Sequence, residues 1–143
     1  MQRNITKTIW AGLGATAVMT MMMYASPMMG MPKMDIAGMI SGMLKMPWAI
    51  GMMIHLMMGV VLFPFTYATV LVGILPGPGA LRGAIWGLIL FILAQIMVMP
   101  MAGMGIFSSA SPQQILMVIG SLMGHLVYGA ILGAIIGRGD CNC

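Results

Sequence analysis

Four long runs of apolar residues divide the chain, and the polar residues gather between them. The runs occupy residues 9–29, 48–75, 81–104 and 114–136. Each run is long enough to cross the hydrocarbon core of a bilayer, which takes a helix of roughly 20 residues. Because backbone polar groups in hydrocarbon must bond within their own segment, the runs predict helices. The expected fold is an all-α integral membrane protein, a four-helix bundle that forms one membrane domain.

The connecting segments predict different local structures. Residues 35–45 carry apolar positions at helical spacing and are bracketed by Lys33, Asp35 and Lys45. This pattern is typical of a short helix on the membrane surface, with Asp35 near its N-terminus. The segment PGPGA between the second and third runs predicts a tight turn. Pro64 lies inside the second run and predicts a kink there.

The two halves of the chain repeat weakly and in the same order. The matched features are Ile9-Trp10 with Ile85-Trp86, PMMGM at residues 27–31 with PMAGM at 100–104, and His55-Leu56-x-x-Gly59 with His125-Leu126-x-x-Gly129. We therefore expect two tandem helical hairpins related by a pseudo-twofold axis along the membrane normal. In an up-down-up-down bundle the second and fourth helices lie on a diagonal. The two histidines would then face each other across the axis.

Composition and charge place the protein in a membrane. Of the residues, 61% are hydrophobic and 6% are charged, whereas a soluble domain carries roughly 25% charged residues. One side of the predicted bundle holds four basic residues and the other holds two: Arg3, Lys7, Arg82 and Arg138 against Lys33 and Lys45. Basic residues favour the cytoplasmic side, so both termini are expected there. The net charge of +4 then indicates topology and lipid contact, not nucleic-acid binding.

Several motifs resemble those of a family of small four-span bacterial membrane proteins that is itself uncharacterised. The motifs are GMPKMDIAGMISGM at residues 30–43, PMAGMGIF at 100–107 and GHLVYGAILG at 124–133. The resemblance covers nearly the whole chain. It implies the four-span fold and a bacterial cytoplasmic membrane, and it implies no activity.

Enzyme chemistry is not expected. Asp35 and Asp140 are the only acidic residues, and both lie outside the apolar runs. The sequence offers no paired carboxylates, no phosphate-binding glycine loop, and no nucleophile with a base and an orienting partner.

The two histidines are the candidate site. An ionisable side chain inside a membrane span is costly and therefore indicates a function, although a neutral histidine can also join two helices by a hydrogen bond. Gly59 and Gly129 follow the histidines by four residues and share their helix faces. Two interpretations of these glycines stay open: space for a flat ligand beside the imidazole, or close helix packing.

Two cofactors suit facing imidazoles. Haem b would take His55 and His125 as axial ligands, with Gly59 and Gly129 beside the macrocycle. Copper would take the same nitrogens together with the thioethers of Met52 and Met58, since soft sulfur ligands select Cu(I). The 22 methionines and the terminal Cys141-Asn142-Cys143 favour copper, but methionine is also an ordinary flexible apolar filler.

The leading hypothesis is a non-catalytic accessory subunit of a larger membrane assembly, for example a respiratory one, with a paired-histidine site for haem b. Its expected partners are the lipid bilayer and other membrane subunits. Two alternatives stay open. One is a copper-handling protein, for transport or storage, and the other is a purely structural bundle without a cofactor.

Overall fold

The computed structural model describes residues 4–137, and within that range every regular element is a helix. The elements are α1 (Ile5–Ala25), η1 (Ser26–Met29), α2 (Ile36–Leu44), α3 (Trp48–Met57), η2 (Met58–Leu62), α4 (Phe63–Thr66), η3 (Tyr67–Leu71), α5 (Gly79–Leu93), η4 (Ala94–Val98), α6 (Met99–Met101), η5 (Ile106–Ser108) and α7 (Gln114–Ile136). η1 and η5 are 3₁₀ turns, whereas η2, η3 and η4 are π-helical turns.

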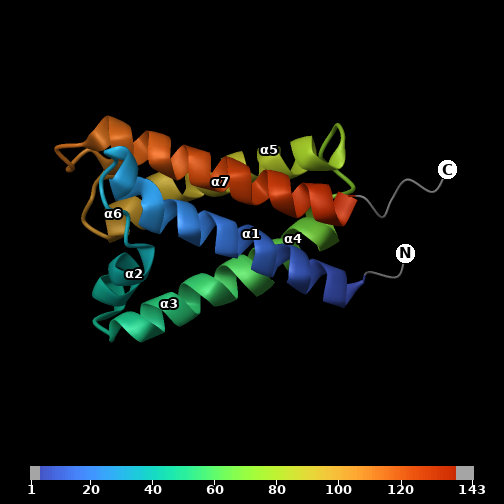
Figure 1. Ribbon diagram of the computed structural model, residues 1–143, viewed down its shortest axis with the longest axis horizontal. Coiled ribbons are helices and arrows are strands. Elements are labelled where there is room, and N and C mark those ends of the chain that lie inside the picture. The colour runs from blue at the N-terminus through green and yellow to red at the C-terminus, as the bar shows by residue number, and fades with distance from the viewer. Residues whose placement is uncertain (1–3, 138–143) are drawn as a thin grey trace.

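Consecutive elements merge into four helices that are long and apolar enough to cross a membrane. We call them spans 1 to 4: Ile5–Met29, Trp48–Leu71, Gly79–Met101 and Gln114–Ile136. They run up, down, up and down, so that both described chain ends lie at one end of the bundle and α2 lies at the other (Figure 1). We call these the terminal end and the α2 end. The all-helical, four-span architecture is thus the one expected from the apolar runs.

The bounds differ from the sequence ranges mainly at the terminal end. Span 1 begins at Ile5, four residues before the predicted start, and span 2 ends at Leu71, four residues before the predicted end. α2 is capped at both ends, and its N-cap is Asp35, as the sequence suggests. Asp35 accepts a hydrogen bond from the Gly38 amide, and Lys45 ends the helix in a left-handed conformation. The expected C-terminal residues Arg138, Asp140, Cys141 and Cys143 lie outside the described residues, as does Arg3.

Spans 3 and 4 are in direct backbone contact. A Cβ atom added at Gly83 would collide with the carbonyl oxygen of Gly129, and one added at Gly129 would collide with that of Gly83. Gly87 lies in the same way against the carbonyl of His125. Without side chains between them, the helices approach closely along this seam, which is how small residues drive helix association in lipid.

Span 1 joins the two halves of the bundle, because it packs against both α7 and the middle of span 2. Span 2 in turn meets α5 near the terminal end. The order around the bundle is therefore span 1, span 2, span 3 and span 4, and spans 2 and 4 lie on a diagonal, as expected. The terminal half is filled by a tight core that consists of Ala11, Ala15, Tyr67, Val72, Trp86, Leu90, Tyr128 and Leu132.

Pro64 of span 2 and Pro100 of span 3 each follow a π-helical turn. η2 ends two residues before Pro64, and η4 ends two residues before Pro100. A proline ring clashes with the carbonyl four residues earlier in a regular helix, and one extra residue in the turn moves that carbonyl away. At Pro64, where the sequence predicts a kink, the helix widens into the π-helical turn η2. Gly12 of α1 leaves room for it, since a Cβ there would lie 2.5 Å from the Pro64 ring and 2.7 Å from the Val60 carbonyl oxygen.

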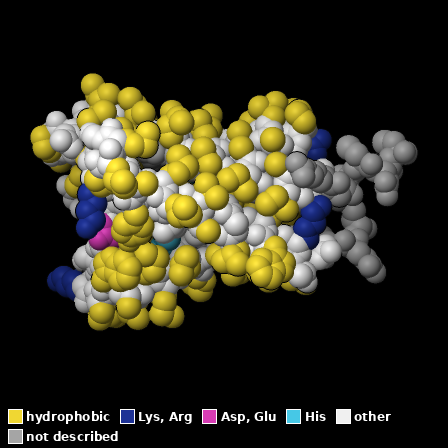
Figure 2. Space-filling view, viewed as in Figure 1, with side chains coloured by type: hydrophobic (Ala, Val, Ile, Leu, Met, Phe, Trp, Pro, Cys, Tyr) yellow, Lys and Arg dark blue, Asp and Glu magenta, His cyan; other side chains and the backbone are white. Residues whose placement is uncertain are grey.

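Charged side chains lie at the two ends of the bundle, and hydrophobic ones cover the middle of the visible face (Figure 2). At the terminal end, Nζ of Lys7 donates to the Ile136 carbonyl at 3.3 Å, and Nη1 of Arg82 donates to the Val72 carbonyl at 3.2 Å. A cation near the start of span 1 and another near the start of span 3 thus each donate to a carbonyl at the C-terminal end of a neighbouring span.

We predict that Gly83→Ala destabilises the bundle by about 1–3 kcal/mol, because the new methyl group forces spans 3 and 4 apart. The measurement is the thermal unfolding midpoint in detergent. Gly14→Ala is the matched control, since its Cβ would meet nothing within 4 Å and alanine favours the helix. Equal midpoints for the two variants would contradict the close contact.

Candidate functional site: a methionine-lined cavity

A cavity of about 420 Å³ opens inside the half of the bundle near α2. All four spans and α2 contribute to its wall. From α7 it receives one helix face at spacings of three and four residues: Met117, Gly120, Ser121, Gly124, His125 and Tyr128. A cavity of this size lies within the usual range for a small ligand or cofactor. None of its lining residues carries a formal charge when the histidines are neutral.

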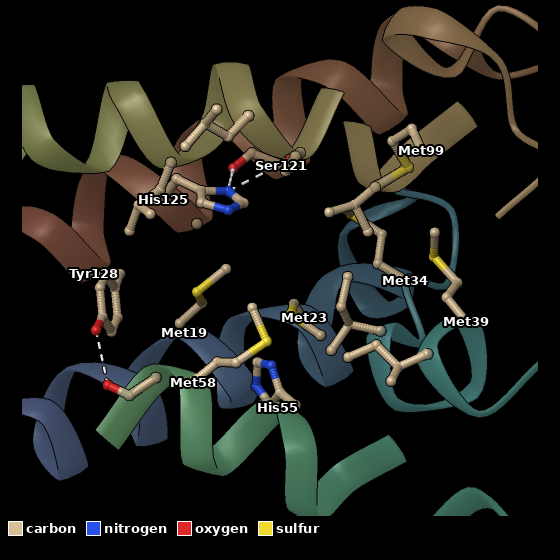
Figure 3. A pocket seen from close by; sticks show the side chains of 18 of the residues that line it. Met19, Met23, Met34, Met39, His55, Met58, Met99, Ser121, His125 and Tyr128 are labelled. Carbon is tan, nitrogen blue, oxygen red and sulfur yellow. Dashed lines mark hydrogen bonds between the residues drawn. The ribbon is translucent and has the colours of Figure 1, made fainter. Parts of the chain in front are cut away.

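Both candidate histidines line this one cavity. His125 comes from α7 and His55 from α3, and they lie on opposite walls in Figure 3. The side chains of Met19 and Met58 lie between the two rings in this view. The structure therefore brings together His55, His125 and Met58 of the predicted set and adds Met19 from span 1.

The His125 ring is held in a defined orientation. Its Nδ1 lies 2.7 Å from the backbone carbonyl oxygen of Ser121. Because a carbonyl oxygen can only accept a hydrogen bond, Nδ1 carries the hydrogen. The neutral ring then has its free lone pair on Nε2, the state that a metal ligand requires. Phe91 of α5 packs edge-on against the ring, with centroids 6.3 Å apart.

His55 is held differently. Its Nε2 shares a hydrogen bond of 3.2 Å with the Thr20 hydroxyl of span 1. This bond joins span 2 to span 1, which is the joining role that a histidine inside a membrane can also play. The two imidazoles thus share a cavity and have different hydrogen-bonding partners.

The two glycines lie in helix contacts. A Cβ at Gly59 would lie 2.5 Å from the Thr16 hydroxyl oxygen of span 1, and Gly129 is pressed against Gly83. Gly59 still borders the cavity, whereas Gly129 and Met52 are not among its lining residues. At the predicted glycines the geometry supports close packing. Space beside His125 comes instead from Gly124, where a Cβ would touch the Met19 side chain at 3.6 Å.

Methionine is concentrated in the wall. Ten of the 27 lining residues are methionine, whereas the whole chain has 22 in 143 residues. The methionine fraction of the cavity wall is more than twice that of the whole chain. Methionine is therefore not distributed evenly, as a general apolar filler would be. The four buried methionines, Met23, Met34, Met99 and Met117, all line the cavity.

The cavity ends at Tyr128, towards the terminal end. The Tyr128 hydroxyl donates to the Gly59 carbonyl at 2.7 Å and thereby joins spans 4 and 2 across the diagonal. That carbonyl lies in η2, where the π-helical turn alters the regular bonding pattern. Beside it, the buried Thr16 hydroxyl has no hydrogen-bond partner in the described part of the chain.

α2 covers the other end. One side of it, including Met39, Ile40 and Met43, faces the cavity. Asp35 accepts a hydrogen bond from the Trp48 indole at 3.1 Å and so ties the start of α2 to the start of α3. Gly51 of α3 lies directly against the Ala37 carbonyl of α2. His55 and Met58, which line the cavity, are themselves partly exposed, so the wall is not complete.

Gln95 lies in the middle of span 3 and pairs with Ser108. It is fully buried, and its Oε1 lies 3.5 Å from the Ser108 hydroxyl. The residues that sequence reasoning missed are Thr20, Ser121 and Phe91, which orient the rings. Thr16, Met19, Thr20 and Met23 recur at helical spacing, and that periodicity could have identified this face of span 1.

The donor set restricts what the cavity can hold. Within residues 4–137, no three His, Cys, Asp or Glu side chains gather into a metal site. A metal at the two imidazoles would therefore take methionine sulfur to complete its coordination. Thioether and imidazole together suit Cu(I), and they do not suit the hard cations that prefer carboxylates.

The fold and site define an all-helical protein with four candidate membrane spans and a histidine- and methionine-lined cavity. The chain belongs to a family of unknown function, DUF6789, which matches residues 2–140. No curated protein and no solved structure matches the chain. The family covers nearly the whole chain, in agreement with the resemblance to an uncharacterised family.

We predict that Tyr128→Phe lowers the stability of the bundle by about 1 kcal/mol, because the Gly59 carbonyl loses a buried hydrogen-bond donor. Unfolding of the purified protein by denaturant in detergent measures the change. Tyr24→Phe is the control, since Tyr24 is 41% exposed. If both variants unfolded at the same denaturant concentration, the hydrogen bond between spans 2 and 4 would contribute nothing to the stability of the bundle.

Proposed function

We propose that this protein is a non-catalytic multi-pass membrane protein that binds copper(I) between His55 and His125. The thioethers of Met19 and Met58 complete the site. Met19 takes the place that the sequence suggested for Met52, which lies outside the cavity wall. The observation that carries the proposal is the placement of two methionine side chains between two imidazoles in one cavity (Figure 3).

The chemistry of each group supports this assignment. Imidazole nitrogen and thioether sulfur are neutral, so they bind a monovalent soft cation without adding charge to a low-dielectric site. The Ser121 carbonyl fixes His125 in the tautomer that offers Nε2. The Phe91 ring restricts its rotation. Preorganised ligands lose less conformational entropy when the metal binds.

Haem b is less well supported as the occupant. Its two propionates would require cationic partners, and the cavity-lining residues include neither Lys nor Arg. A porphyrin would also displace the methionines that lie between the imidazoles in Figure 3. The haem hypothesis predicts a Soret band, which the experiment below also measures. Membership of a larger membrane assembly stays a prediction.

The proposed location is the bacterial cytoplasmic membrane, with both termini in the cytoplasm. Among the described residues, each end of the bundle carries two basic side chains: Lys7 and Arg82 at the terminal end, and Lys33 and Lys45 at the α2 end. These four residues do not set the orientation in the membrane, which therefore depends on Arg3 and Arg138. In this orientation α2 and the open side of the cavity face away from the cytoplasm. The role is then to hold copper at the outer half of the membrane.

We predict that protein purified under reducing conditions binds a single Cu(I) ion per chain, and that His55→Ala and His125→Ala reduce bound copper to background. Met19→Leu with Met58→Leu weakens binding while the histidines stay in place. Metal analysis after titration with Cu(I) against a competing chelator measures occupancy.

Met57→Leu is the matched control, since Met57 is 60% exposed and lies outside the cavity wall. Copper bound equally by the wild type and both histidine variants would refute the site. Copper at background level in the wild type would refute copper binding as the function. A Soret band that is present in the wild type and lost in His125→Ala would show haem binding instead.

A further inference from the structure

We infer that the cavity exchanges its metal at the α2 end alone, through a mouth of methionine thioethers, and that it is closed towards the terminal end. This inference rests on the proposed function and adds the direction of access. It makes the protein a one-sided holder of copper(I) that takes the ion from, and returns it to, a carrier on the α2 side. A channel would need a second opening.

Closure at the terminal end follows from the packing below the histidines. Tyr128 is 2% exposed, and its hydroxyl is bonded to the Gly59 carbonyl. Below it, the fully buried side chains of Ala11, Ala15, Tyr67 and Leu132 fill the centre of the bundle. Passage would require breaking the Tyr128 bond and moving close-packed side chains, which protein interiors resist.

The terminal half is also closed by backbone contacts. The contact of Gly79 and Gly83 with Gly133 and Gly129 brings spans 3 and 4 together without intervening side chains. On the opposite side, Gly12 packs against Val60 and Pro64. Neither seam has side chains that could swing aside to open a path.

The α2 end has the opposite character. Met39 and Met43 of α2 are partly exposed, Met34 beside them is 8% exposed, and Met23 further in is also 8% exposed. Figure 3 shows labelled methionines from Met39 through Met34 and Met23 to Met58 beside His55. Thioethers therefore extend from the partly open side of the cavity to the imidazoles.

The glycine at position 120 makes this arrangement possible. A Cβ there would lie 3.0 Å from the Met34 sulfur, so the absence of a side chain gives that sulfur its place against α7. Methionine is flexible and polarisable. A series of such groups passes a soft cation inward by exchanging one thioether for the next, with no charged group and no proton transfer.

The test uses full-length protein loaded with Cu(I) and reconstituted into vesicles, where it inserts in both orientations. Protease cleavage of a C-terminal tag from outside gives the fraction of molecules whose terminal end faces out. A membrane-impermeant Cu(I) chelator, bathocuproine disulfonate, is then added outside. We expect it to remove copper only from the remaining fraction, whose α2 end faces out.

Removal from the protease-accessible fraction, or from all molecules at one rate, would overturn one-sided access. The copper that counts is the copper that the wild type binds and His55→Ala does not. If the chelator removes this copper from the terminal side, this inference is refuted while the proposed function stands. If the wild type holds no histidine-dependent copper, both fail.

A second variant tests the methionine mouth. Met34→Leu, Met39→Leu and Met43→Leu combined should slow removal from the α2 side several-fold and leave the loaded amount unchanged, because leucine keeps the volume and lacks the sulfur. The control combines Met28→Leu, Met29→Leu and Met53→Leu, three methionines that are 65% exposed or more and lie outside the cavity wall. Equal rates for the two triple variants would show that the thioethers do not carry the ion.

Discussion

The backbone contact between spans 3 and 4 determines the shape of the whole bundle. Gly83 and Gly129 bring two helices together with no side chain between them, and the terminal half is correspondingly solid. At the other end, Gly120 and Gly124 accommodate the methionines Met34 and Met19 in place of a neighbouring backbone. Glycine is thus used in two ways along one helix: at 129 and 133 it closes the bundle, and at 120 and 124 it makes room for thioethers.

The spans themselves are irregular where the bundle needs them to be. The π-helical turns η2 and η4 accommodate Pro64 and Pro100 and leave backbone groups with unusual partners. Tyr128 satisfies one of them, the Gly59 carbonyl. In hydrocarbon such a group would be costly if unpaired, so the Tyr128 bond compensates for the irregularity and closes the floor of the cavity. One interaction therefore links the π-helical turn η2, helix packing and the boundary of the cavity.

Sequence patterns predicted the coarse structure well and the site in part. The four helices followed from the length of the apolar runs, and the N-cap of α2 followed from Asp35, whereas the left-handed Lys45 that ends α2 was not predicted. The repeat predicted that His55 and His125 face each other, and both line one cavity, which was not itself predicted. The pattern around His55 could not reveal that Met52 lies outside the wall, because a helix of uniform apolarity gives no sign of which face points inward. Met19 could have been identified from the helical spacing of Thr16, Met19, Thr20 and Met23.

The repeat also could not reveal how each hairpin packs. Gly59 packs against Thr16, and the equivalent Gly129 packs against Gly83. These two neighbours are not equivalent in the repeat, because Thr16 lies six residues after Trp10 and Gly83 lies three residues before the matching Trp86. The two hairpins therefore place equivalent residues against different neighbours.

His125 bonds to a carbonyl of its own helix, and His55 bonds to Thr20 of another span. The duplicated motif thus gives two imidazoles in different environments: a backbone carbonyl fixes the tautomer of His125, and a hydroxyl shares a hydrogen bond with the Nε2 of His55. A metal bound as proposed would leave the bond between His125 and Ser121 in place, whereas at His55 it would compete with the bond between spans 1 and 2. The proposed occupancy of the cavity would thereby be coupled to the packing of these two spans.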